Sequence, residues 1–174
     1  MPSSPAPVSD PIAQLCPACG LCCNGALFSD VELGKGDDPE RLGQLGLAIK
    51  KKGRKLVFSQ PCDCFDGKWC SAYSSRPGRC RAFECRLLLR VRQGVLKVPS
   101  ALKTIADARR KAESVRSLLR ALGNTDEGLA MTRRYSKIMA QPLDLADDNA
   151  VEIRARLMVE VAELMTLFQR DFLT

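Results

Sequence analysis

The sequence contains no histidine, few aromatic residues and no apolar run of membrane-spanning length. Its 174 residues include one Trp, two Tyr and six Phe. The absence of histidine excludes catalytic pairs of serine or cysteine with histidine, and metal sites with imidazole ligands. No segment approaches the roughly 18 consecutive apolar residues of a membrane span. The N-terminal segment also lacks the basic region and apolar run of a secretory signal, so we expect a soluble, cytoplasmic protein.

Cysteine, in contrast, is abundant. The chain has nine cysteines, an odd number that would leave one thiol over in a fully paired disulfide framework. The cytoplasm keeps ordinary thiols reduced, so a cysteine cluster there favours metal binding or redox chemistry. A disulfide scaffold, a redox-active C-x-x-C pair and unrelated free thiols are the alternatives. With no histidine, a protein-only site must be rich in sulfur, which favours zinc or an iron–sulfur cluster over magnesium or calcium.

The cysteines fall into two groups along the chain. The first group, in the stretch 16-CPACGLCC-23, is Cys16, Cys19, Cys22 and Cys23, and the second is Cys62, Cys64, Cys70, Cys80 and Cys85. A C-x2-C spacing lets a tight turn present two sulfurs to one metal, and Gly20 supplies the backbone freedom of such a turn. Cys22 and Cys23 are adjacent, so their side chains are expected to diverge. Whether these two thiols share a centre decides between one metal centre and two.

The pattern along the chain predicts a mostly α, α+β fold. We expect a disordered lead (1–14), a cysteine-cluster metal-binding domain with short strands (15–95) and a helical extension of about three helices packing on it (96–174). Within these segments we expect strands at 26–33 and 55–58, a helix at 38–51 capped by Asp38, a type I′ turn at Asp66-Gly67, and helices at 99–122, 125–139 and 148–172. Thr125 is the expected cap of the second of these C-terminal helices.

Positive charge is concentrated in one segment. Residues 76–120 carry 13 Lys and Arg against three acidic residues, a net charge of +10, although the whole chain carries +7. Such a segment could bind nucleic acid or an acidic partner. The alternative is a solvated helix face that also offsets the negative charge of thiolates.

The cysteines and their neighbours resemble a known family. Cys16, Cys19, Gly20, Cys22 and Cys23 are followed by Pro61-Cys62, by Cys70 and Tyr73, and then by Arg76-Pro77, Cys80-Arg81, Phe83 and Cys85. This compound pattern, over about residues 16–90, is similar to that of the cysteine-cluster family of zinc- or iron-chelating proteins, the CxxCxxCC domain, which includes the flagellin lysine N-methylases. The resemblance implies a bound metal with eight ligands: Cys16, Cys19, Cys22, Cys23, Cys62, Cys70, Cys80 and Cys85. Cys64 departs from the family pattern and is the candidate spare thiol.

Three functional hypotheses follow. The first is an iron–sulfur protein whose cluster is redox-active or structural. The second is a structural zinc module that presents the basic segment 76–120 to nucleic acid or an acidic partner. The third is an enzyme acting through the cluster, although no segment recognisable as a methyl-donor site is present and no catalytic residue can be named.

Overall fold

The structure is a computed structural model that describes residues 10–174. Its elements are α1 (Pro11–Cys19), β1 (Asp30–Glu32), α2 (Pro39–Gln44), β2 (Ile49–Lys52), β3 (Lys55–Ser59), a 3₁₀ turn (Tyr73–Ser75), α3 (Gly78–Ala82), α4 (Arg86–Arg92), α5 (Val98–Ala121), α6 (Met131–Met139) and α7 (Asp148–Asp171). The predicted α+β fold, mostly helical with three C-terminal helices, is confirmed. α1 begins at Pro11, inside the segment 1–14 expected to be a disordered lead, and residues 1–9 of that segment lie outside the described part.

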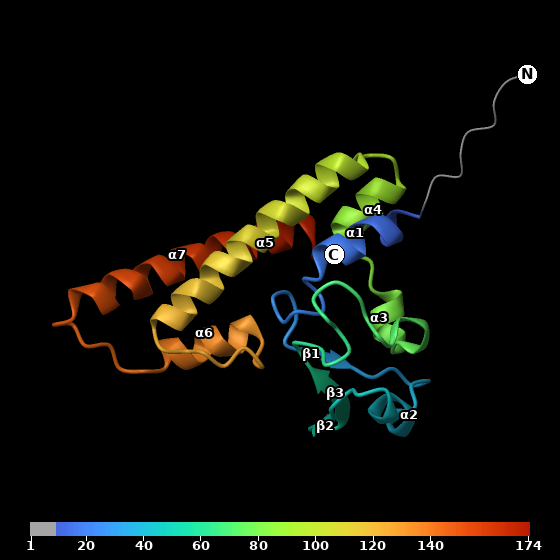
Figure 1. Cartoon of the computed structure of the whole chain (residues 1–174), viewed down its shortest axis with the longest axis horizontal. Coiled ribbons are helices and arrows are strands. Elements are labelled where there is room, and N and C mark those ends of the chain that lie inside the picture. The colour runs from blue at the N-terminus through green and yellow to red at the C-terminus, as the bar shows by residue number, and fades with distance from the viewer. Residues whose placement is uncertain (1–9) are drawn as a thin grey trace, which may run out of the picture.

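The sheet is small and antiparallel, with strand order β1-β3-β2. Val31 of β1 lies opposite Phe58 of β3, and Ile49 of β2 lies opposite the same Phe58 on its other side. Phe58 is almost fully buried and joins a small core formed by Leu42, Leu47, Phe58, Cys64 and Ala72. We call this cluster the second core, to distinguish it from the larger main core described below. The strands and α2 that contribute to it lie at the end of the molecule away from the long helices (Figure 1).

One predicted helix is shorter than the sequence pattern indicated. Asp38 caps α2 as expected, because its carboxylate accepts hydrogen bonds from the backbone N–H groups of Glu40 and Arg41. The helix ends at Gln44, since Gly46 takes a φ of +98° that no helix contains. Residues 49–52, expected to continue the helix, instead form β2 and pair with β3. The prediction of a helix through residue 51 was therefore wrong.

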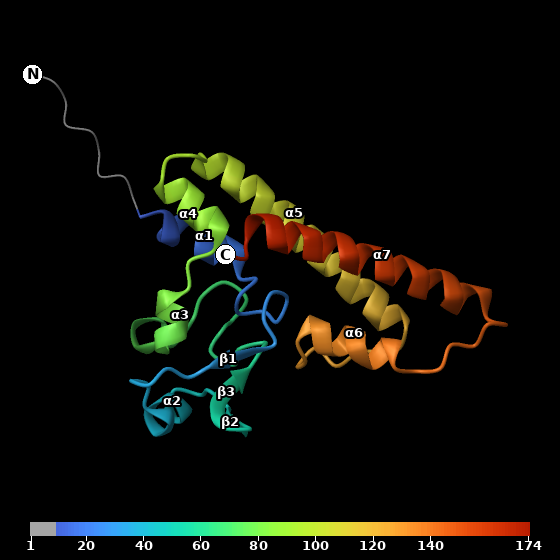
Figure 2. The same cartoon turned by 180° about the vertical axis from the view of Figure 1, so that it is seen from behind.

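The C-terminal part consists of two long helices and a short one. α5 and α7 pack against each other and cross at an angle, with α6 beneath them in both views (Figures 1 and 2). Gly123 follows α5 with a φ of +82°, the left-handed conformation expected of a helix-ending glycine. α6 begins at Met131 without a side-chain cap, so the predicted start at Thr125 was wrong. Residues before α6 form a loop because Glu127 is held by Arg134 and Arg120 instead of opening a helix.

The main core joins the cysteine-bearing half to these helices. Leu15 of α1, with Leu21 and Ala26 just after it, is buried together with the inner faces of α4, α5, α6 and α7. α1 packs on both α4 and α5. Among the described residues, no helix combines the length and the apolar character needed to cross a membrane.

Candidate metal centre

Cys16, Cys19 and Cys22 lie at and just beyond the C-terminal end of α1. Cys16 and Cys19 belong to the last turns of this helix, and Gly20 ends it in the left-handed conformation, with its N–H donating to the Cys16 carbonyl at 3.1 Å. Cys23 then donates its backbone N–H to the Gly20 carbonyl at 3.0 Å. The glycine-dependent turn inferred from the sequence is therefore present, and it folds the C-x2-C-x2-C segment back on itself.

Cys85 joins these three thiols from a distant part of the chain. It caps α4, and its sulfur accepts a hydrogen bond from the Leu88 N–H at 3.4 Å. Because α1 packs against α4, the Cys85 thiol comes within electrostatic reach of Cys16, Cys19 and Cys22. Burial, with smaller contributions from the neighbouring thiols, raises the pKa of Cys19 to about 12. We call Cys16, Cys19, Cys22 and Cys85 the first thiol group.

The other matched cysteines gather around Cys23. The backbone N–H of Cys62 donates to the Cys23 carbonyl at 2.8 Å. An isolated antiparallel β-bridge between Phe65 and Cys70 brings Cys70 back toward the segment that carries Cys62. Cys80 is carried by the short helix α3. Burial, with smaller contributions from the Cys80, Cys70 and Cys16 thiols, raises the pKa of Cys23 to about 12. We call Cys23, Cys62, Cys70 and Cys80 the second thiol group.

The loop between Cys62 and Cys70 turns back as expected, but by a different turn. A type I′ turn needs positive φ at both central residues, and in this loop only Gly67 has a positive φ, so the predicted Asp66-Gly67 turn of that type was wrong. The Asp66 carboxylate instead accepts hydrogen bonds from the backbone N–H groups of Lys68 and Trp69. The approach of Cys70 to Cys62 therefore depends on an Asp side chain as well as on a glycine.

Cys64 stands apart from both groups in its packing. Its side chain is 5% exposed and lies inside the second core, and its thiol donates to the Leu45 carbonyl at 3.1 Å. It is still close enough to Cys62 and Cys70 to contribute to the raised pKa of each, after burial. The Cys64 thiol therefore has a hydrogen-bond acceptor, the Leu45 carbonyl, without any metal. Its role as the spare thiol stays a prediction.

Arg76 lies between the two thiol groups. Its positive charge acts to lower the pKa of Cys16 in the first group, and of Cys23, Cys70 and Cys80 in the second, against the larger effect of burial. The guanidinium stacks on the Tyr73 ring at 4.0 Å from its centroid. Its Nε–H is buried and has no hydrogen-bond partner among the residues described. Arg76 thus offers a positive charge and a free donor where the thiols gather, whereas Arg81 is exposed.

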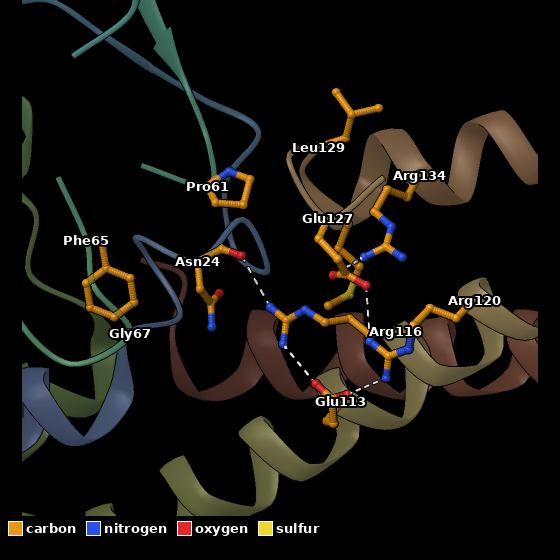
Figure 3. A pocket seen from close by; sticks show the side chains of 11 residues that line it. Asn24, Pro61, Phe65, Gly67, Glu113, Arg116, Arg120, Glu127, Leu129 and Arg134 are labelled. Carbon is orange, nitrogen blue, oxygen red and sulfur yellow. Dashed lines mark hydrogen bonds and ion pairs between the residues drawn. The ribbon is translucent and has the colours of Figure 1, made fainter. Parts of the chain in front are cut away.

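A cavity of about 340 Å³ lies beside the cysteine loops, between them and the helices α5 and α6 (Figure 3). Arg116 of α5 reaches across it and donates to the Asn24 carbonyl at 3.2 Å, directly after Cys23. Figure 3 shows that Arg116 and Arg120 both approach Glu113, and that Arg120 also contacts Glu127. The cationic groups of the cavity are therefore already paired with carboxylates or carbonyls.

The comparison with known families settles where the chain belongs. Residues 15–108 match the model of the CxxCxxCC family, described as "Putative zinc- or iron-chelating domain". The chain belongs to this family. No curated protein and no solved structure matches it. Metal binding by this CxxCxxCC protein, with zinc or iron as the metal, is the function that the family description supports.

The cysteines of this CxxCxxCC protein have the right donor atoms for zinc or iron, but their side chains do not converge as metal ligands do. Both thiol groups offer only sulfur, the donor that zinc and iron–sulfur clusters prefer, and the Arg76 Nε–H is an unused donor suited to an anionic thiolate centre. Over residues 10–174, however, no three Cys, Asp or Glu side chains converge closely enough to hold a metal ion. Metal binding in this CxxCxxCC protein therefore requires the thiols to lie closer together than they do in this structure.

Sequence reasoning missed two arginines that support the cysteine segment. Arg109 donates to the Ala18 carbonyl at 2.7 Å, and Arg116 to the Asn24 carbonyl. They are seven residues apart, two turns of α5, and so share one helix face. Their spacing was the available signal, but the net charge of the segment 76–120 obscured it.

Many charges of that basic segment are paired. Arg92 pairs with Glu84, Lys111 with Glu163, and Arg120 with both Glu113 and Glu127. Glu84 and Glu113 are already included in the net charge of +10, but Glu127 and Glu163 lie outside the segment and lower the positive charge around it further. Binding of nucleic acid or of an acidic partner through this segment stays a prediction.

Proposed function

We propose that this CxxCxxCC protein binds an iron–sulfur cluster through its matched cysteines, with a redox or structural role. The observation that carries the proposal is the make-up of the first thiol group. Cys16, Cys19 and Cys22 follow each other at C-x2-C-x2-C spacing, and Cys85 approaches them from a remote segment. Three cysteines at this spacing with a fourth from elsewhere in the chain are typical of a [4Fe–4S] cluster. A [4Fe–4S] cluster takes four cysteine ligands, for which the first thiol group is proposed. The other four matched cysteines, Cys23, Cys62, Cys70 and Cys80, are proposed as further metal ligands.

Burial and charge around the thiols support this choice. Cys19 and Cys85 pack against the main core, which limits the access of water to a cluster. Low solvent exposure and hydrogen bonds to the sulfurs are two of the factors that set the potential of such clusters. Arg76 would offset part of the negative charge of the thiolates, and Tyr73 holds its guanidinium in position. When bound, a cluster supplies a one-electron redox site and a covalent cross-link between α1 and α4.

Purification without oxygen tests the proposal. We expect brown protein that contains iron and acid-labile sulfide, with visible absorption that fades on exposure to air. Colourless protein with stoichiometric zinc and no sulfide would contradict the iron–sulfur proposal and favour the zinc module.

A pair of matched variants tests the ligands themselves. Cys19→Ser removes a thiol of the first group and should lower iron and sulfide content, since serine oxygen is a poor ligand for these clusters. Cys64→Ser removes the thiol that already has the Leu45 carbonyl as a partner, and should leave the metal content unchanged. Equal loss of metal from the two variants would show that the ligand assignment is wrong.

A further inference from the structure

We propose that the eight cysteines form two separate four-thiol metal centres, and that the peptide bond between Cys22 and Cys23 crosses from one centre to the other. The inference rests on the proposed function, because it requires the thiols to bind metal. The first centre would use Cys16, Cys19, Cys22 and Cys85. The second would use Cys23, Cys62, Cys70 and Cys80.

The first centre is defined by the packing of two helices. α1 carries Cys16 and Cys19 in its last turns, and α1 packs on α4, whose N-terminal cap is Cys85. Cys19 and Cys85 both contact the main core. Cys22 follows within the Gly20 turn, and the thiols that act with burial to raise its pKa are Cys19, the adjacent Cys23, Cys85 and Cys16. These four thiols are therefore brought together by the same helix contact.

The second centre is defined by different contacts. The hydrogen bond from the Cys62 N–H to the Cys23 carbonyl places Cys23 beside the second cysteine loop, and the bridge between Phe65 and Cys70 closes that loop. Cys62, Cys70 and Cys80 all pack against the second core, which contains Phe58 and Leu42, and not against the main core. Cys19 and Cys85 of the first group thus border the main core, whereas Cys62, Cys70 and Cys80 of the second group border the second core.

Two neighbouring four-thiolate centres need a cation between them. Four thiolates around one Zn²⁺ ion, or around one [4Fe–4S]²⁺ cluster, leave about two net negative charges, so two such centres repel each other. Arg76 lies within electrostatic reach of Cys16 in the first group and of Cys23, Cys70 and Cys80 in the second. A single positive side chain that faces both groups lowers this repulsion. Its buried, unpartnered Nε–H is available to a sulfur of either centre.

Metal content of two serine variants distinguishes two centres from one. Cys85→Ser removes a ligand of the first centre only, and Cys80→Ser removes a ligand of the second only. We expect each variant, purified without oxygen, to keep about half of the metal of the wild-type protein, or to lose one of two different metals. Cys64→Ser, the matched control, should keep all of it.

Cadmium replacement gives a second readout that needs no variant to fold. Cadmium NMR of the wild-type chain loaded with cadmium should show two signals of equal intensity, both from sites with only sulfur ligands. A single signal, or complete metal loss in both Cys85→Ser and Cys80→Ser, would overturn the two-centre inference while leaving metal binding intact. Wild-type protein without any bound metal would instead overturn the proposed function.

Discussion

Replacing Gly20 with alanine tests the contact between the CxxCxxCC turn and the second cysteine loop. Gly20 ends α1 at a φ of +65°, which is costly for a residue with a Cβ atom. A Cβ atom placed there would lie 2.6 Å from the Cζ atom of Phe65, so the Phe65 ring would have to move. Phe65 lies in the loop between Cys62 and Cys70, and its backbone forms an antiparallel β-bridge with that of Cys70. The substitution therefore disturbs both thiol groups without removing a thiol.

The cost can be worked out from these two contacts. The left-handed backbone costs about 1–2 kcal/mol for alanine, and a displaced ring adds about 0.5–1.5 kcal/mol. The smaller conformational entropy of alanine in the unfolded chain offsets about 0.4–1 kcal/mol. We therefore expect Gly20→Ala to lower the free energy of unfolding by about 0.5–3 kcal/mol and to weaken metal retention.

Urea unfolding at a fixed metal concentration measures this cost, since metal concentration itself changes stability. Gly43→Ala is the matched control, because Gly43 lies in α2 and a Cβ atom added there would have no neighbouring atom within 4 Å. The Gly43→Ala variant should be about 0.5–1 kcal/mol more stable than the wild-type protein. In a Phe65→Ala background, Gly20→Ala should cost about 0.5–1.5 kcal/mol less, because the ring is gone. An unchanged cost in that background would refute the role of the Phe65 contact.

Three further predictions concern other parts of the chain. Arg134→Met should lower the free energy of unfolding by about 2–4 kcal/mol, because this 1%-exposed side chain donates hydrogen bonds to Asn124 and Glu127. The control variant Arg110→Met changes an exposed arginine and should lower it by less than about 0.5 kcal/mol. Thermal melting compares the two variants, and similar melting points would count against the prediction. Burial acts to raise the pKa of Asp30, but the ion pairs with Lys52 and Arg133 have the larger combined effect and lower this pKa below its ordinary value of 3.8. The ion pairs therefore stabilise the fold at pH values above 3.8, and this stabilisation is lost as the pH falls through the lowered pKa. Asp30→Asn should then be about 1 kcal/mol less stable than wild type near neutral pH and equal to it well below the ordinary pKa, and a pH-independent difference in urea unfolding would argue against this linkage. Removal of metal by a chelator should destabilise the chain while α5 and α7 keep part of their helical signal in circular dichroism, and complete loss of that signal would show that the helices depend wholly on the metal.

Sequence patterns predicted the elements that local chemistry determines. Asp38 and Pro39 open α2 because capping is a property of neighbouring residues, and the glycine after α5 ends that helix for the same reason. The start of α6 was predicted too early, at Thr125, because Glu127 is bound by the buried Arg134, seven residues further on. That contact depends on tertiary packing, which a local pattern does not contain.

The candidate site shows the same division. The turn at Gly20 and the eight-cysteine pattern were predictable because both lie in short motifs. The association of Cys85 with the first three cysteines was not, since it follows from the packing of α1 on α4. Spacing alone would have grouped Cys85 with Cys80, five residues away. The division of the thiols between two cores likewise requires the fold.

The shared main core sets the smallest piece of this chain that can fold. The family match ends at residue 108, in the middle of α5 (Val98–Ala121). A fragment cut there would split the helix and uncover Leu15 and Leu21, whose apolar surface α5 and α7 bury. Each such leucine is worth about 1.5–3 kcal/mol when buried, a large part of the stability of a small domain. We therefore expect the unit that folds to be longer than the matched residues 15–108, and a chain truncated at residue 108 to carry its cysteines on a less stable scaffold than the full chain does.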